Sequence, residues 1–279
     1  MKVESISLKG SNPYNEDRLV ANEDHSLYAV FDGCSSIVKW RSESGETGGS
    51  LAARIAAETF ERADREESLL GIAKRANEHI ERGMSAKGIE RPIKEERWGT
   101  VLVAARLSED TLEYIQIGDC MAFAIYRGGI IRPLTYPQVG HLEINSLLKW
   151  KEGIGNGLKT VKELSDYTAA TVRSNRKLSN TREGYGVLNG EPEAENFLEY
   201  GKIHIGQLEH LILVTDGLFW PEKDPEPETD WSQTVQGILE HGLEAYAKSI
   251  LQMEEKDQGG QTYIRLKKSD DKTGIVLHF

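Results

Sequence analysis

The chain has 279 residues, of which 38% are hydrophobic and 28% charged, a balance that is typical of a soluble globular protein and excludes a disordered one. The formal net charge of −11, with no compensating basic tract, argues against nonspecific binding to nucleic acid. No apolar run approaches the ~18 residues that a membrane span needs, and the start, MKVESISLKG, lacks the apolar core of a secretion signal.

Length, acidity and cysteine content leave some questions open. The length is near the upper end for one hydrophobic core, so one elaborate domain and two small ones both fit. The surplus of acid is either a device for solubility or the sign of clustered carboxylates that only a bound cation makes tolerable. Two cysteines, Cys34 and Cys120, are too few for a disulfide framework, which predicts a reducing cytoplasm.

The N-terminal part predicts a buried strand followed by two helices. The strand is SLYAVFDG, residues 26–33, where an apolar run leads into Asp-Gly. Apolar residues recur at helical spacing from Leu51 to Ala63, behind the glycines at 48 and 49, and again from about Glu67 to Lys87. We expect both helices to pack their apolar faces onto a core.

Strands dominate the next part of the chain. GTVLVAARL (99–107) is a continuous apolar run, TLEYIQIGD (111–119) alternates, and MAFAIYRGGIIRPLT (121–135) predicts a hairpin about Gly128 and Gly129. Because the linkers are too short for a crossover helix, we expect antiparallel pairing.

Residues 136–196 break this pattern, since they are polar, rich in glycine and only moderately helical. We interpret them as an insertion that lies over one end of the sheets. Strands follow in FLEYGKIHIG (197–206) and HLILVTDG (210–217). One long helix is expected over roughly Trp231 to Met253, and two short strands around an acidic turn are expected within 262–279.

Acidic side chains stand at strand ends or tight turns in five places. Taken singly, each is typical of an ordinary turn or an acidic loop. Taken together, they favour one mouth where carboxylates converge around hard cations such as Mg²⁺, Mn²⁺ or Ca²⁺, because close carboxylates resist joint ionisation without a cation. The residues are Glu16 and Asp17, Asp32, Asp119, Asp216, and Asp270 and Asp271.

These acidic sites fall within an ordered set of short blocks that spans nearly the whole chain. The blocks are NED at 15–17, VFDG at 30–33, TGGSLAA at 47–53, WGTVLVA at 98–104, IQIGDC at 115–120, LILVTDGL at 211–218 and DDKTGIVL at 270–277. In this order they resemble the metal-dependent serine/threonine phosphatases of the PPM type, the protein phosphatase 2C family, in a divergent bacterial-type form. The resemblance implies an α+β fold, a four-layer α-β-β-α sandwich of two antiparallel sheets flanked by helices. It implies a single phosphatase-like domain over 1–279, with the insertion at about 136–196 as a flap beside the active site.

The resemblance also implies roles for the matching residues. Asp32 would bridge two Mn²⁺ or Mg²⁺ ions, with the carbonyl of Gly33 as a further ligand. Glu16 would serve one ion, and Asp216 and Asp270 the other, partly through waters. Asp32 and Asp216 are accordingly the candidate catalytic residues.

Two more acidic residues receive supporting roles from the resemblance. Asp17 would hold the metal-binding residues in position without binding an ion itself, and Asp119 matches a place where some members hold a third ion. The implied activity is hydrolysis of phosphoserine and phosphothreonine on proteins by a metal-activated hydroxide. The expected partners are a phosphorylated protein substrate and a cognate serine/threonine kinase in the cytoplasm, with no nucleic acid and no membrane.

The chain departs from the family pattern where phosphate is expected to bind. Asn12 stands four residues before Glu16, where the family usually has an arginine that grips the substrate phosphate, and the usual glycine pair after the bridging aspartate is replaced by residues 34–36, CSS. Metal binding is therefore better supported than turnover. The candidates to replace the arginine are Arg18, ranked first for its proximity in sequence, Lys39 and Arg41.

Other functions compete with metal-dependent phosphatase activity. A catalytically impaired phosphatase-like binding or regulatory module is the alternative, favoured by Asn12 and the CSS substitution. Thiol catalysis is opposed because a C-x₅-R loop from Cys34 would need arginine at Trp40, and Arg41 comes one place too late. The seven histidines show no close pair with zinc spacing, and no Walker-type loop indicates nucleotide hydrolysis.

Overall fold

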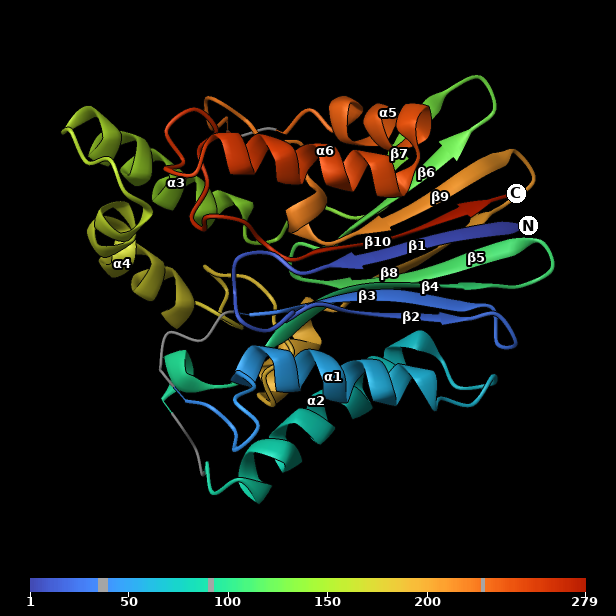
Figure 1. Cartoon of the computed structure of the whole chain (residues 1–279). Helices are drawn as coiled ribbons and strands as arrows, with labels where there is room; N and C mark the ends of the chain where they lie inside the picture. The colour runs from blue at the N-terminus through green and yellow to red at the C-terminus, as the bar shows by residue number, and fades with distance from the viewer. Residues whose placement is uncertain (35–39, 90–92, 227–228) are drawn as a thin grey trace.

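Figure 1 shows the computed structural model of the chain as two β-sheets stacked face to face, with helices on the outer face of each sheet. The structure describes residues 1–34, 40–89, 93–226 and 229–279. The predicted α+β fold with two antiparallel sheets and flanking helices is confirmed. Within the described parts of the chain, none of the helices combines the length and apolar character that crossing a bilayer requires.

Among the described residues, each sheet has five strands, and neighbouring strands run antiparallel. The first sheet has the order β1 (Lys2–Leu8), β10 (Lys272–His278), β9 (Leu208–Val214), β6 (Met121–Tyr126) and β7 (Ile130–Pro133). The second has the order β2 (Arg18–Asn22), β3 (Leu27–Gly33), β4 (Thr100–Leu107), β5 (Thr111–Ile117) and β8 (Glu199–His204).

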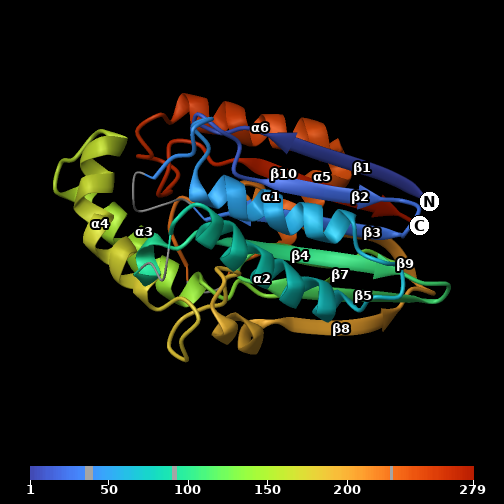
Figure 2. The ribbon, with the colours of Figure 1, turned by 90° about the horizontal axis from the view of Figure 1, so that it is seen from below.

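Two pairs of helices form the outer layers. Helices α1 (Gly48–Glu61) and α2 (Leu69–Ala86) cover the second sheet, and α5 (Ser232–His241) and α6 (Leu243–Lys256) cover the first, as Figures 1 and 2 show. A third pair, α3 (Gly140–Gly155) and α4 (Val161–Lys177), lies beyond one end of the strands (Figure 1). Three 3-10 helices complete the list: η1 (Lys94–Glu96), η2 (Pro192–Phe197) and η3 (Asp216–Leu218).

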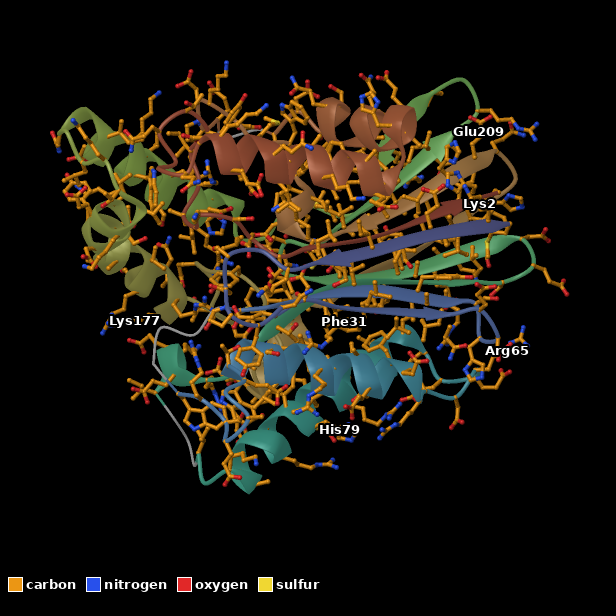
Figure 3. The ribbon with its side chains drawn as sticks, in the orientation of Figure 1. Lys2, Phe31, Arg65, His79, Lys177 and Glu209 are labelled. Atoms are coloured by element: carbon orange, nitrogen blue, oxygen red, sulfur yellow. The ribbon has the colours of Figure 1, made fainter. Side chains whose placement is uncertain are left out.

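Strand β3 shows why the central apolar runs are continuous. Ala29 and Phe31 belong to the core beneath α1 and α2, whereas Tyr28 and Val30 belong to the core between the sheets. A strand covered on both faces carries apolar residues at every position. Phe31 lies between the second sheet and α1 (Figure 3), where its ring packs edge-on against Phe60 with the centroids 5.3 Å apart.

The predicted long helix from Trp231 to Met253 is wrong, because the structure has two helices that meet at Gly242. This residue has φ 79° and ψ 153°, a conformation that cannot continue a right-handed helix. Val235 of α5 and Tyr246 of α6 are nevertheless both buried against the first sheet. The apolar spacing runs through the break, so it could not reveal it.

The prediction of two strands within 262–279 is also wrong, since this segment contains the single strand β10. A loop replaces the other strand because the Asp257 carboxylate takes up the local backbone donors. It accepts the N–H groups of Gln261, Thr262 and Tyr263 at 2.9 to 3.2 Å, and it pairs with Arg265 at 2.8 Å. Backbone groups satisfied in this way need no partner strand.

Candidate metal centre

One end of the sandwich collects the chain segments that carry the predicted acidic residues. Strand β3 ends with Asp32 and Gly33, Asp119 lies between β5 and β6, Asp216 follows β9, and Asp270 precedes β10. The starts of β6 and of β10 both pair with the end of β9, so three of these turns lie at the same end of the first sheet. Segments far apart in sequence therefore present their carboxylates together.

Each Asp-Gly pair stands where a second acidic segment approaches the backbone. A Cβ atom at Gly33 would lie 2.6 Å from the Gly49 carbonyl group and 2.7 Å from the Glu16 carbonyl oxygen. A Cβ atom at Gly217 would overlap the carbonyl oxygen of Asp271. Only glycine leaves room for these contacts. The two glycines thus let the acidic segments meet, which an isolated turn would not require.

Asp271 ties the segment around Glu16 to the start of β10. Its two carboxylate oxygens accept the backbone N–H of Gly10 at 2.7 Å and that of Glu16 at 2.6 Å. The Glu16 carboxylate accepts hydrogen bonds from the Asn12 amide, at 3.1 Å, and from the Thr47 hydroxyl, which also caps α1. Asn12, which stands at the expected arginine position, is therefore turned toward Glu16.

The carboxylates at this end raise one another's pKa. Burial raises the pKa of Asp32 well above its ordinary value, and the charges of Asp216 and Asp17 add to the effect. Burial also raises the pKa of Asp216 well above its ordinary value, with Asp270 as the next cause. Asp32, Asp216 and Asp270 keep some exposed surface, so they are not sealed in the core.

Asp17 and Asp119 belong to the same electrostatic group. Burial and the charge of Asp270 raise the pKa of Asp17 to about 7, although the Thr215 hydroxyl donates to its carboxylate at 2.8 Å. The pKa of Asp119 rises to about 6, mainly through burial. Such crowding costs free energy until a cation neutralises it.

Sequence reasoning missed two charged residues of this end. Lys267, in the loop before β10, donates to both carboxylate oxygens of Asp270, at 2.8 and 2.6 Å. Glu143 of α3 has its pKa raised to about 7 by burial and then by the charge of Asp119. Neither residue lies in a recognisable motif, and only the folding of the loop and of α3 brings them here.

The residues present fit a hard divalent cation in donor chemistry. The donors are carboxylate oxygens, and the Oδ1 atom of Asp119 is buried with no hydrogen-bond partner among the described residues. Over the same residues, no three or more His, Cys, Asp or Glu side chains are arranged so that they could already hold a metal ion. The ammonium of Lys267 at Asp270 supplies positive charge at the place where the carboxylates would converge.

The comparisons with known proteins decide the family. The sequence model described as protein phosphatase 2C matches residues 9–145, close to half of the chain. Over the whole chain, the fold is shared with solved phosphatases. Residues 9–145 belong to the protein phosphatase 2C family. Members of this family are metal-dependent protein serine/threonine phosphatases.

Three solved bacterial phosphatases illustrate the structural likeness. One is a bacterial serine phosphatase, with 16% identity, 99% of this chain and 96% of that chain covered, and a TM-score of 0.59. Stp1 from Staphylococcus aureus has 16% identity, coverage of 100% and 94%, and a TM-score of 0.58. The catalytic domain of PstP, described in complex with two manganese ions, has 17% identity, coverage of 99% and 96%, and a TM-score of 0.57. At these identities the likeness shows the fold alone. The comparison with curated proteins finds no match.

Of the three basic residues predicted to replace the family's arginine, Arg18 and Arg41 lie within the described residues. Arg18 donates to the carbonyl oxygens of Asn15 and Asp17, at 2.7 and 2.6 Å, which is a structural role. Arg41 is exposed and donates to its neighbour's carbonyl, and Lys39 lies outside the described residues. Phosphate binding by any of the three stays a prediction.

The third residue that sequence reasoning missed is Arg176 of α4. Its guanidinium interacts electrostatically with Cys34, two residues after Asp32, and less strongly with Asp32 itself. An arginine from the helices beyond the strands therefore lies within electrostatic range of the aspartate that the resemblance assigns to the centre. No local signal in residues 161–177 distinguishes it from the solvated arginines of a polar helix.

Proposed function

We propose that the protein is a metal-dependent phosphatase that hydrolyses phosphoserine and phosphothreonine on proteins. The observation that carries the proposal is the gathering of Asp32, Asp119, Asp216 and Asp270, from four separate strand ends, into one group. Burial and the charge of Asp270 raise the pKa of the other three. Groups of this kind at a partly exposed mouth are typical of sites that bind cations and perform chemistry.

Two Mn²⁺ or Mg²⁺ ions would be held by Glu16, Asp32, the Gly33 carbonyl, Asp216 and Asp270, with Asp119 available to a third. Bound ions of this kind activate water as the nucleophile and neutralise the charge of the transferring phosphoryl group. Asp32 and Asp216 are the proposed catalytic residues because they occupy the centre of the electrostatic group. Asp17 holds the surrounding segments, through its hydrogen bond from Thr215.

Arg176 is the proposed contact for the substrate phosphate. Guanidinium groups bind phosphate oxygens in a bidentate manner, and Arg176 interacts electrostatically with Asp32, near which the phosphoryl group would be held. Helices α3 and α4 would then act as the predicted flap, which places an arginine and an acid, Glu143, over the mouth. We further propose a phosphorylated protein substrate, a cognate serine/threonine kinase and a cytoplasmic location.

Hydrolysis of para-nitrophenyl phosphate and of a phosphothreonine peptide in Mn²⁺ tests the proposal. The parent protein should show activity that a chelator abolishes, and Asp32→Ala should remove both Mn²⁺ binding and turnover. The matched control is Asp110→Ala, which removes an exposed carboxylate from a turn at the other end of β5 and should leave both unchanged. An Asp32→Ala protein that keeps the parent rate in Mn²⁺ would overturn the proposal.

Arg176 can be tested separately on the same substrates. Replacing it by alanine should raise KM for the phosphopeptide or lower kcat/KM by about tenfold or more, equivalent to ~1.4 kcal/mol of transition-state binding. Arg173→Ala, on the exposed side of α4, is the matched control. Equal effects of the two substitutions would contradict a phosphate contact by Arg176.

A binding or regulatory module without activity is the second candidate. It is favoured by Asn12, whose amide is engaged with Glu16 at the position of the family's arginine. Tight Mn²⁺ binding together with no chelator-sensitive hydrolysis, on aryl phosphate and phosphopeptide alike, would support the module instead of the enzyme.

A further inference from the structure

Lys267 occupies a place among the carboxylates that none of the predicted roles explains. Its ammonium donates to both oxygens of Asp270, at 2.8 and 2.6 Å, so one side chain engages both oxygens of this carboxylate. Asp270 is one of the residues proposed to hold a divalent ion. An ion and the ammonium would therefore compete for the same two oxygen atoms.

The surroundings of Lys267 are acidic on more than one side. Burial alone would lower its pKa, but Asp270, Asp32 and Asp216 outweigh it and hold the pKa well above its ordinary value. Lys267 also acts on Asp119 and on Glu143, whose charges it favours. The ammonium thus interacts with carboxylates from β3, η3, the β5–β6 turn, α3 and its own loop, as a central cation would.

The loop that carries Lys267 is fixed on both sides of it. On one side, Arg265 pairs with Asp257 at 2.8 Å. On the other side, the Ser269 hydroxyl donates to Glu254 of α6 at 2.7 Å, and the Ser269 carbonyl accepts the backbone N–H of Ser11 at 2.9 Å. A loop tied at both flanks presents its lysine to the mouth without a large entropic cost.

The charge balance shows that one lysine does not replace every metal ion. Lys267 brings one positive charge to a group that contains Asp32, Asp119, Asp216 and Asp270, and the last of these is the only one to which it donates. The remaining carboxylates still need a cation. A divalent ion therefore remains necessary, whereas a second ion at Asp270 has to displace the ammonium.

We propose that Lys267 is a resident cation of the centre, which takes the place of the divalent ion served by Asp270. The inference rests on the proposed metal-dependent function, which it deepens. The parent protein then holds one Mn²⁺ ion tightly and takes up a second only at higher concentration, after Lys267 has left Asp270. The lysine sets the metal content of the centre, and with it the Mn²⁺ concentration at which the centre fills.

Isothermal titration with Mn²⁺ compares the parent protein with Lys267→Met, which removes the charge and keeps the length of the side chain. The variant should take up one more Mn²⁺ ion than the parent, or bind its second ion about tenfold more tightly or better, the change that ~1.4 kcal/mol of binding free energy produces. Lys268→Met is the matched control, because it removes the same charge from the neighbouring, exposed position. It should titrate like the parent.

A second pair of variants guards against a folding defect in Lys267→Met. Lys267→Gln should repeat its gain in Mn²⁺ uptake, and Lys267→Arg, which keeps the charge, should titrate like the parent. Free Mn²⁺ followed by electron paramagnetic resonance gives an independent count of bound ions. The inference is overturned if the parent, Lys267→Met and Lys267→Gln bind the same number of ions with affinities within about twofold, a difference of ~0.4 kcal/mol.

Hydrolysis of para-nitrophenyl phosphate, measured on the same samples, separates this inference from the proposed function. A gain in Mn²⁺ uptake without hydrolysis in any sample supports the resident cation and rejects the enzyme. Chelator-sensitive hydrolysis with unchanged Mn²⁺ uptake supports the enzyme and rejects the resident cation. Failure of every sample to bind Mn²⁺ rejects both.

Discussion

Replacing Asp17 by asparagine should stabilise the metal-free protein, and more so at high pH than at low pH. Asp17 is 2% exposed, and its pKa is raised from 3.8 to about 7 in the fold. Between these two values the unfolded chain has lost a proton that the folded protein keeps. The stability linked to this group is therefore fully present below the ordinary pKa and is lost as the pH rises through about 7.

The size of the effect follows from the shift. A rise of about three pKa units corresponds to ~4 kcal/mol at about pH 8, and the same relation leaves ~2 kcal/mol at about pH 5. Asparagine carries no charge, and its amide can still meet the Thr215 hydroxyl that donates to Asp17. Any cost of the altered hydrogen bonds is the same at both pH values, so the change between them isolates the charge.

Urea unfolding of the parent and of Asp17→Asn, in chelator at both pH values, measures this change. The advantage of the variant should grow by ~2–3 kcal/mol from about pH 5 to about pH 8. Asp110→Asn, at an exposed turn, should show no such growth. A difference between parent and Asp17→Asn that stays constant with pH to within ~0.5 kcal/mol would refute the electrostatic reasoning.

Two further substitutions test how the centre is held. The side chain of Lys272 is fully buried and pairs with Glu254 at 2.7 Å, so Lys272→Met should lower the free energy of urea unfolding by ~3–5 kcal/mol. The control Lys248→Met removes a lysine from an exposed pair and should lower it by no more than ~0.5 kcal/mol. Equal losses would show that the buried pair does not anchor the start of β10. Gly217→Ala should destabilise the fold by at least ~2 kcal/mol and weaken Mn²⁺ binding, because the new methyl group would overlap the backbone before β10. The control Gly155→Ala, at the end of α3, places its methyl group in open space and should be neutral. Unchanged Mn²⁺ binding by Gly217→Ala would contradict the close approach of the two segments.

The spacing of apolar residues along the chain predicted most of the fold, because the central strands bury both faces. Strand β3 is the clearest case, with Phe31 under α1 and Val30 against the other sheet. The pattern failed where a single backbone conformation decided the outcome, as at Gly242, since apolar spacing is the same on both sides of the break. It failed again before β10, where the Asp257 carboxylate satisfies backbone donors that a strand would have used.

The predicted acidic residues of the centre were visible in sequence because Asp-Gly recurs at the ends of apolar runs. The structure adds a reason for the glycine, which is the contact of Gly217 with the segment before β10. The basic residues near the centre could not be identified from the sequence. Lys267 and Arg176 act across 3 and 144 positions of sequence from Asp270 and Asp32, respectively, and only the folded loop and α4 give them their neighbours.

Diffraction from crystals soaked in Mn²⁺, with anomalous data at the manganese edge, tests the central claim most directly. We predict a strong anomalous peak bounded by Asp32 and Asp216, with carboxylate oxygens from separate strand ends as its ligands. A crystal that takes up Mn²⁺ elsewhere on the acidic surface, and shows no peak among these carboxylates, would contradict the account.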